Sequence, residues 1–527
     1  MAEITLDFKP RKQQKEMLAF TTSAINSGKK FIMIDAPTGT GKSFFAIMLS
    51  HWYTKTYNKK AKIDILTNTK LLQDQYVDDF EFAANLKGNN NYYCGKHKIN
   101  CGEAKLINRA NNDHCKICPH RIAQNKFTRS PLSLTNFHLA TSYMMYLPQF
   151  FLERDARLLI IDEANMFEET FCDFIASTLS ERSLKLMDIW EPFMESDISR
   201  LDTLPAISGY IADVVIPLID NKIEEHLSGV KNLRGKKKLD AAKKADFIDK
   251  IKCKYDRFVG DSENYKTNWI FEKDLDNHGK TRITVEPIWG NIYLKENFWD
   301  KYDHIVLMSG TILDQELFSF IMGIPNEEST YLSLDCPFDA EKRPVIYAKF
   351  GKMSYYDKAE TFKIAAPVIA NILKKNAKHK GIIHTSTYQF SKWIQEQVKD
   401  KRLLFHTTAT REKTLKKHIV SQKETVIVSP SMINGIDLKD ELSRFQIILK
   451  VPFPNLMSKR IKRRLETKPE WYNWKALADL LQAYGRSIRN STDWAETYIL
   501  DSCFDQIRYN APQYFKDALK IKTLPKK

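Results

Sequence analysis

Residues 36–43 read Ala-Pro-Thr-Gly-Thr-Gly-Lys-Ser and stand between a β-type apolar run and a helix-type run. In that context a glycine-rich loop turns its backbone N–H groups toward an anion at a helix N-terminus. Ala36 stands where this pattern usually begins with Gly, and its small side chain still allows close approach. We therefore expect ATP and Mg²⁺ to bind here. The expected contacts are Thr38, Gly39, Thr40 and Gly41 around the phosphates, Lys42 on the β and γ phosphates, and Ser43 on the metal.

A second candidate site is the acidic pair Asp162 and Glu163, which ends the apolar run 158–161. Ligands of parallel sheets bind at the carboxyl ends of strands, so this pair can face the same nucleotide. We expect Asp162 to hold Mg²⁺ and Glu163 to polarise the attacking water. Alone, such a pair is commonly a solvated strand end, but beside a phosphate loop it indicates a hydrolytic site.

A third set, Gln482, Arg486 and Arg489, is spaced so that its members can share one helix face. Arginines that reach the γ phosphate from a second domain neutralise charge on the transferred phosphoryl group. An ordinary basic helix face would explain the same spacing if the other two motifs were absent. With them, we expect these three residues to be catalytic together with Lys42, Asp162 and Glu163.

Four of the eight cysteines fall between residues 94 and 118. Four thiolates can hold a 4Fe-4S cluster, and they can equally hold structural zinc. The spacing alone leaves both metals open. The cysteines are Cys94, Cys101, Cys115 and Cys118, and the histidines that could replace one of them on zinc are His97, His114 and His120.

The elements that must position these residues are short β-rich runs, each followed by a helix-type stretch, and this alternation predicts parallel α/β layers. Two stretches, 87–129 and 171–294, interrupt it and read as insertions. Near the end of the second, the segments 269–271 and 282–285 flank a turn-type sequence and predict a hairpin. Residues 520–527 read as a solvated tail. The β-rich runs are 31–34, 63–66, 158–161, 305–307, 382–384, 425–428 and 446–451.

The overall composition is that of a globular protein, with 43% hydrophobic and 28% charged residues among 527. The formal net charge of +16 favours a polyanionic partner. The amino-terminal residues have no apolar core, and no apolar run approaches the roughly 18 residues that cross a bilayer. We therefore expect a cytoplasmic protein without a signal peptide or membrane contact, in a compartment too reducing for structural disulfides.

Taken in order, the three motifs resemble those of superfamily 2 helicases, and further segments resemble the DinG and XPD-like iron-sulfur branch over nearly the whole chain. The resemblance implies base contacts by Arg11 and Gln14, and nucleotide-site roles for Gly435 and Asp437. The segments around the cysteines also resemble this branch, which favours iron-sulfur over zinc. Asn165 stands where the branch commonly carries His. The segments concerned are 8–14, 67–75, 86–94, 135–138, 308–312, 336–338, 384–387, 434–437 and 451–454.

The resemblance implies two RecA-like parallel-sheet motor domains, with an iron-sulfur insert and a mostly helical arch-like insert in the first. Motor domain 1 would comprise residues 1–86 and 130–170 and regain the chain at 295–320. The iron-sulfur domain would be 87–129, the arch-like insertion 171–294, and motor domain 2 residues 321–527.

The function implied by the resemblance is that of a monomeric ATP-dependent DNA helicase, which moves 5′ to 3′ on single-stranded DNA and unwinds forked or overhang duplexes. One alternative is a nucleic-acid-stimulated ATPase or translocase without unwinding. Another is a zinc-stabilised nucleic-acid-binding module with a decayed ATPase. The basic run 459–464 and the pair Tyr92 and Tyr93 could contact the strand, although a solvated helix face and a small-domain core explain them equally well.

Overall fold

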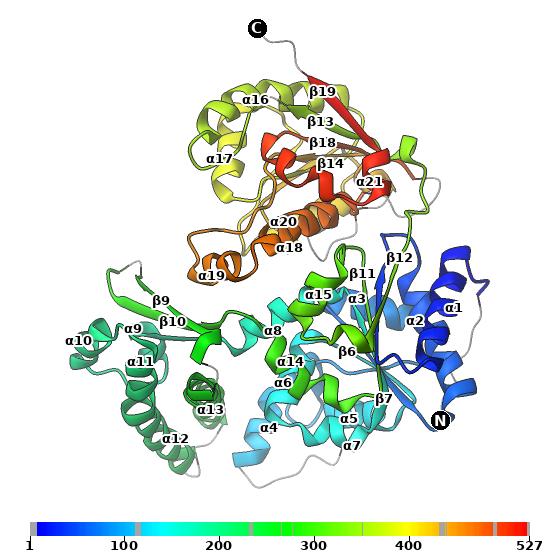
Figure 1. The fold of residues 1–527 in the computed structure, drawn as a ribbon. Coiled ribbons are helices and arrows are strands. Elements are labelled where there is room, and N and C mark those ends of the chain that lie inside the picture. Colours follow the sequence, from blue (N-terminus) through cyan, green and yellow to red (C-terminus); the bar gives the residue numbers. More distant parts are fainter. Residues whose placement is uncertain are drawn as a thin grey trace.

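The computed structural model describes residues 8–110, 117–230, 235–264, 266–276, 278–349, 351–431, 438, 440–487 and 493–523. Its framework is two seven-stranded sheets, each wholly parallel and covered by helices. Figure 1 shows one sheet in the upper part of the molecule and the other in the lower right, with a largely helical lobe at the lower left. The predicted α/β class with two parallel sheets is confirmed.

The first sheet has the strand order β12-β1-β11-β7-β2-β6-β3. Its central strands are buried along almost their whole length, which is why they read as continuous apolar runs without alternation. The strands are β1 (Phe31–Asp35), β2 (Lys62–Thr67), β3 (Ala84–Asn85), β6 (Leu132–Asn136), β7 (Ala156–Asp162), β11 (His304–Ser309) and β12 (Ser329–Ser333). The helices in this part are α1 (Lys12–Asn26), α2 (Lys42–Trp52), α3 (Lys70–Asp79), α6 (Phe137–Tyr146), α7 (Gln149–Arg154), α8 (Phe167–Ile175), α14 (Asn291–Asn297) and α15 (Gln315–Met322).

The second sheet has the order β15-β16-β14-β17-β18-β13-β19. Its strands are β13 (Val345–Lys349), β14 (Gly381–His384), β15 (Leu403–Leu404), β16 (Val426–Ser429), β17 (Phe445–Ile448), β18 (Glu496–Ile499) and β19 (Leu519–Thr523). The helices are α16 (Lys358–Lys375), α17 (Tyr388–Gln397), α18 (Arg411–Val420), α19 (Lys459–Thr467), α20 (Pro469–Tyr484) and α21 (Gln513–Asp517). Helix α20 lies at the boundary between the two sheets (Figure 1).

The cysteine-bearing segment leaves the first sheet after β3 and returns to it at β6. It consists of the ribbon β4 (Tyr93–Cys94) and β5 (Ile99–Asn100) with the helices α4 (Cys101–Ala110) and α5 (Pro119–Arg129). The second insertion follows α8 and ends in the hairpin β9 (Trp269–Leu275) and β10 (Thr281–Pro287), as predicted. Its other elements are β8 (Ser177–Ser180), α9 (Glu181–Leu186), α10 (Phe193–Arg200), α11 (Leu204–Tyr210), α12 (Ile216–Val230) and α13 (Gly235–Asn264).

Two boundaries predicted from the sequence are wrong. Strand β12 pairs with β1, so the chain leaves the first sheet only after residue 333 and not at residue 321. Strand β19 pairs with β13, so residues 519–523 extend the second sheet as an edge strand and are not a solvated tail. The lysines of β19 explain the error, because charged side chains that alternate with apolar ones are typical of sheet edges. Among the residues described, no helix has the length and apolarity needed to span a bilayer.

Candidate active site

The phosphate loop follows β1 and leads directly into α2. Gly39 and Gly41 have φ angles of 88° and 83°, left-handed values that glycine adopts without steric cost. Gly41 is also the residue before the first turn of α2, where the helix presents free N–H groups. Lys42 donates to the Ala36 carbonyl at 2.9 Å, so its ammonium group folds back over the loop. The loop therefore has the backbone that the sequence predicts for phosphate binding.

Arg11 and Gln14, the expected base contacts, lie beside this loop at the start of α1. Arg11 Nη1 donates to the Gly39 carbonyl at 3.1 Å, and Gln14 Nε2 donates to the Gly41 carbonyl at 3.4 Å. Gln14 is buried, and a Cβ on Gly41 would lie only 2.2 Å from its amide nitrogen. The two side chains thus hydrogen-bond to the backbone of the phosphate loop. In addition to the base contacts that the resemblance implies, they stabilise the loop itself.

Asp162 ends β7 and is almost completely buried. Tyr76, from α3, donates its hydroxyl to Asp162 Oδ2 at 3.0 Å. Burial raises the pKa of Asp162 to about 6, although the nearby Lys42 ammonium lowers it. Two acidic neighbours that share one lysine are a suitable environment for a divalent cation, because bound metal stabilises the ionised carboxylate.

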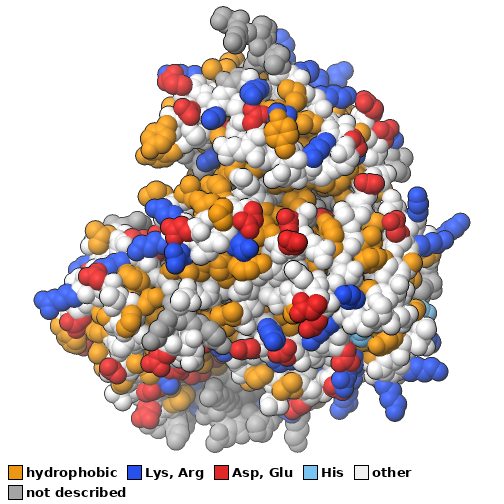
Figure 2. Space-filling view, in the orientation of Figure 1, with side chains coloured by type: hydrophobic (Ala, Val, Ile, Leu, Met, Phe, Trp, Pro, Cys, Tyr) orange, Lys and Arg blue, Asp and Glu red, His pale blue; other side chains and the backbone are white. Residues whose placement is uncertain are grey.

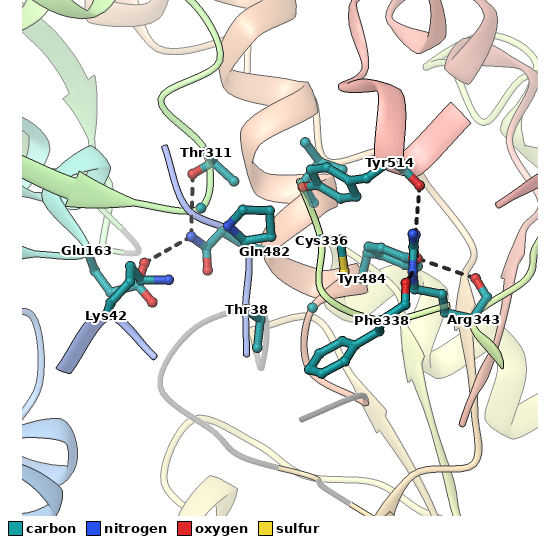
Figure 3. Close-up of a pocket in the computed structure, with 14 residues that line it drawn as sticks. Thr38, Lys42, Glu163, Thr311, Cys336, Phe338, Arg343, Gln482, Tyr484 and Tyr514 are labelled. Atoms are coloured by element: carbon teal, nitrogen blue, oxygen red, sulfur yellow. Dashed lines mark hydrogen bonds between the residues drawn. The ribbon is translucent and has the colours of Figure 1, made fainter. Parts of the chain in front are cut away.

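Glu163 and Gln482 connect the two motor sheets across the cleft (Figure 3). Gln482, in the last turn of α20, donates to Glu163 Oε2 at 3.1 Å and lies 3.4 Å from Thr311 Oγ1. Arg486 donates to Gln482 Oε1 at 2.9 Å, just after the helix ends. The structure therefore brings three of the predicted catalytic residues, Lys42, Glu163 and Gln482, to line one cleft, and Arg486 contacts one of them. Arg489 lies outside the described residues.

A hydroxyl relay ties the strand end to the following loop. Ser309, the last residue of β11, donates to Asn165 Oδ1 at 2.8 Å and accepts from the Thr311 N–H at 3.1 Å. Thr311 in turn contacts Gln482. Asn165, which stands where the resembling branch carries His, thus still joins the acidic strand end to the loop of residues 309–311.

The cleft also contains side chains that sequence reasoning did not select. The space in and above the cleft, counted together with the open solvent at its mouth, is about 520 Å³. Arg343 donates to the Phe338 carbonyl and to the hydroxyl of Tyr484, each at 3.0 Å. The Phe338 ring packs so closely on the loop that a Cβ on Gly39 would lie 2.0 Å from it. No local motif marks Arg343 or Tyr514, because their proximity depends on the tertiary fold. The lining residues beyond residue 333 are Cys336, Phe338, Arg343, Leu481, Gln482, Tyr484, Gly485 and Tyr514.

Three of the four clustered cysteines pack together. Cys94 and Cys101 are buried in one small cluster, and Cys118 packs against it. Burial raises the pKa of the Cys101 thiol, while an N–H of His120 lowers it. The fourth cysteine, Cys115, and His114 lie outside the described residues. In the part of the chain that the structure describes, no group of three or more His, Cys, Asp or Glu side chains forms a metal site.

The candidates for strand contact divide into two groups. Arg460 and Arg464 of the basic run are buried and form ion pairs within the protein, so they are not exposed to a phosphate track. Tyr92 packs on the His120 ring, whereas Tyr93 is 62% exposed. The motif residues Gly435 and Asp437 lie outside the described residues.

Comparison with known protein families gives two matches along the chain. Residues 7–179 match the family described as "Type III restriction enzyme, res subunit", and residues 369–520 match "Helicase C-terminal domain". The chain is 28% identical over 270 residues to the ATP-dependent DNA helicase DinG of Photobacterium profundum, covering 46% of the chain and 37% of that protein. It is 33% identical over 105 residues to the ATP-dependent DNA helicase YoaA of Escherichia coli, covering 18% and 15% respectively.

The chain also shares its overall fold with solved structures. An XPD helicase superposes with a TM-score of 0.62 at 15% identity, covering 98% of this chain and all of that one. An apo XPD structure gives a TM-score of 0.59 with the same coverage. The matched segments span 37% or less of the two sequence relatives named above. The chain is thus similar in sequence to DNA helicases of the DinG type over part of its length, and it shares the fold of the XPD helicase.

Proposed function

We propose that the chain is an ATP-dependent DNA helicase that moves along single-stranded DNA and separates the duplex ahead of it. The observation that carries this proposal is the bond from Gln482 to Glu163, which links the second motor sheet to the hydrolytic carboxylate of the first. Such a bond makes hydrolysis sensitive to the relative position of the two sheets. An ATPase with that property can convert hydrolysis into movement along a strand.

Each residue of the cleft has a role in this scheme. Lys42 binds the β and γ phosphates, and Asp162 and Ser43 hold Mg²⁺, which neutralises phosphate charge when it is bound. Glu163 orients the attacking water and accepts its proton. Arg486 stabilises the charge that develops on the transferred group, and we assign Arg489 the same task.

The substrate and direction rest on the relatives. DinG and YoaA are both named as ATP-dependent DNA helicases, and we propose DNA as the substrate of this chain, with single-stranded, forked and overhang forms as its partners. We further propose 5′ to 3′ movement and a monomeric motor with an arch-like insert at residues 171–294. The net charge of +16 supports binding to a polyanion.

We also propose that Cys94, Cys101, Cys115 and Cys118 hold a 4Fe-4S cluster. The packing of Cys94, Cys101 and Cys118 in one small cluster supports this proposal, because a 4Fe-4S cluster needs its thiolates close together. The cluster would act as a cross-link that fixes α4 and α5 relative to each other. His120 Nε2 is buried and has no hydrogen-bond partner among the described residues, which makes it the ligand to consider if the metal is zinc.

The function is tested by ATP hydrolysis with and without single-stranded DNA, and by strand displacement from 5′-overhang and 3′-overhang duplexes. We expect DNA-stimulated hydrolysis and displacement only from the 5′-overhang substrate. Lys42→Ala should abolish both while strand binding persists, and Lys59→Ala, at an exposed lysine of the same domain, should change neither. Steady hydrolysis without displacement on any substrate would favour the translocase alternative.

The metal is tested by iron and zinc analysis of anaerobically purified protein together with its visible spectrum. We expect iron near four atoms per chain, the content of one cubane cluster. Cys101→Ser should lose the iron, whereas Cys253→Ser, in the helical insertion, should retain it. Zinc without iron, and no stimulation by DNA, would support the binding-module alternative.

A further inference from the structure

Helix α8 begins directly after the Asp162-Glu163-Ala164-Asn165 segment and carries three carboxylates toward the second half of the chain. Glu168 pairs with Arg464 at 2.7 Å, and Glu169 pairs with Lys475 at 3.0 Å. Asp173 pairs with Arg460 at 2.8 Å. In Figure 1, α19 extends from the second motor domain toward α8 and the β9–β10 hairpin. We call Glu168, Glu169, Arg464 and Lys475 the α8 clasp.

The pair between Glu168 and Arg464 is one of the most buried ion pairs in the described chain, with both side chains 3% exposed. The contact is bidentate, because Arg464 Nη1 also reaches Glu168 Oε2 at 3.2 Å. The guanidinium packs against two indole rings, 4.5 Å from the centre of the Trp289 ring and 5.2 Å from that of the Trp471 ring, and these rings meet edge to face. Its Nε donates to the Ile288 carbonyl at 2.6 Å. A planar group fixed on this many sides specifies one geometry.

The second pair of the clasp, Glu169 with Lys475, involves helix α20, which follows α19 in the chain. Lys475 is in α20, where it also contacts Asp479 at 3.0 Å. The Lys475 ammonium lowers the pKa of Glu169 to about 2, so this carboxylate is charged at any physiological pH. Figure 2 shows hydrophobic side chains along the boundary between the upper and lower parts of the molecule, with charged groups among them. The pair of Glu168 with Arg464 is buried and therefore poorly screened by salt, whereas the Glu169 side chain is 34% exposed.

Helix α20 connects the clasp to the catalytic cleft. Its first half packs in the core of the first motor domain through Trp471 and Trp474, and its second half packs in the core of the second. Gln482 lies about two helical turns beyond Lys475 and on the same side of the helix. Helix α8 follows Glu163 in the chain, and α20 carries Gln482 in its last turn. The clasp and the bond between Glu163 and Gln482 therefore close a ring of contacts.

We propose that the α8 clasp positions Gln482 and Arg486 against Glu163, so that Glu168 and Arg464 are positioning residues for ATP hydrolysis. This inference rests on the proposed ATPase function. The clasp touches neither the phosphate loop nor the base contacts. Its loss should therefore lower kcat while the KM for ATP stays nearly constant, because ground-state binding is intact and only the catalytic geometry is lost.

The test compares Arg464→Lys with wild type. Lysine keeps the charge and much of the length but can neither make the bidentate pair nor pack a planar group against the two indole rings. We expect kcat to fall by about tenfold or more, with KM changed less than about twofold. Arg282→Lys is the matched control, because Arg282 makes a bidentate pair with Asp274 on the exposed hairpin and should tolerate the change.

A double-variant cycle separates positioning from general stability. If the clasp acts through Gln482, Arg464→Lys should have little further effect on kcat in a Gln482→Ala background. Multiplicative loss of kcat in the double variant would overturn the proposal, as would an unchanged kcat in Arg464→Lys.

Hydrogen exchange of the nucleotide-free protein tests the clasp without relying on ATP hydrolysis. If the wild type does not hydrolyse ATP, the proposed function fails, but the exchange experiment still tests whether the clasp holds α20. Protection of the amides at residues 480–486 should fall in Arg464→Lys and stay unchanged in Arg282→Lys. Equal protection in all three proteins would show that the clasp does not hold this end of α20.

Discussion

Arg154 provides the sharpest stability prediction, because it is a completely buried cation with five partners. It pairs with Asp64 of β2 and donates to the carbonyls of Phe127, Thr128, Ser130 and Ile63. Three of these carbonyls close the end of α5, the last helix of the cysteine-bearing segment. Arg154 thus fastens that segment to the first motor sheet.

Replacing Arg154 with Met keeps the volume of the side chain and removes its charge. The Asp64 carboxylate is 1% exposed. Without Arg154 it would still accept a hydrogen bond from the Tyr302 hydroxyl at 2.9 Å. Breaking a buried pair in this way costs about 3–5 kcal/mol. With a urea m-value of roughly 3 kcal/mol/M, the midpoint of unfolding of this domain should fall by about 1–1.7 M.

The assay is urea unfolding followed by circular dichroism, with Arg157→Met as the control. Arg157 forms ion pairs with Asp155 and Asp303 but is 43% exposed, so its loss should cost about 0–1 kcal/mol. The pair Asp64→Asn with Arg154→Met should be more stable than Arg154→Met alone, because no buried charge is left unpaired. Equal midpoints for the Arg154 and Arg157 variants would refute this reasoning.

Three further predictions concern the cleft and the second sheet. Gly39→Ala should weaken binding of a fluorescent ATP analogue by about tenfold or more, because the new Cβ would meet the Phe338 ring and the φ of residue 39 is left-handed. Gly28 has the same left-handed φ without a neighbouring ring, so Gly28→Ala should leave binding of the analogue unchanged. Asn165→Ala should reduce the stimulation of hydrolysis by DNA about two- to tenfold while basal turnover persists, because one hydrogen bond of the relay is lost; an unchanged ratio would contradict this. Burial lowers the pKa of His418 from 6.5 to about 4, so on acidification the unfolded chain binds the proton before the folded chain does. The free energy of unfolding should therefore fall as the pH drops from about 6.5 to 4, by up to roughly 1.4 kcal/mol per pH unit. Thermal unfolding of His418→Gln over that range should show a shallower slope than wild type.

The sequence predicts those parts of the fold that local patterns encode. The phosphate loop and the strand ending in Asp162 were identified correctly because glycines and continuous apolar runs mark buried parallel strands. The predicted runs do not include β3, β6, β12, β13, β15, β18 or β19. For β12 and β19 the reason is their composition, because one carries polar residues and the other alternates lysines with apolar residues. Both lie at sheet edges, where burial is incomplete and the pattern is correspondingly weak.

The candidate site shows the same limit. Gln482 and Arg486 could be selected by their spacing, but the contact of Gln482 with Glu163 joins positions more than 300 residues apart. The basic run 459–464 suggested exposed phosphate contacts. The structure instead turns Arg460 and Arg464 inward, because their carboxylate partners lie on distant segments that no local pattern connects to them.

The division of α20 between two cores affects how the chain acquires its structure. Trp471 and Trp474 are buried only when the first motor domain is present to receive them. A second motor domain produced by itself would expose both indoles and leave Arg464 without its carboxylate partner, conditions that favour aggregation. During synthesis, the earlier half of the chain would have to be folded before this helix could settle. The two motor domains are thus separate in sheet topology but form a single unit in folding.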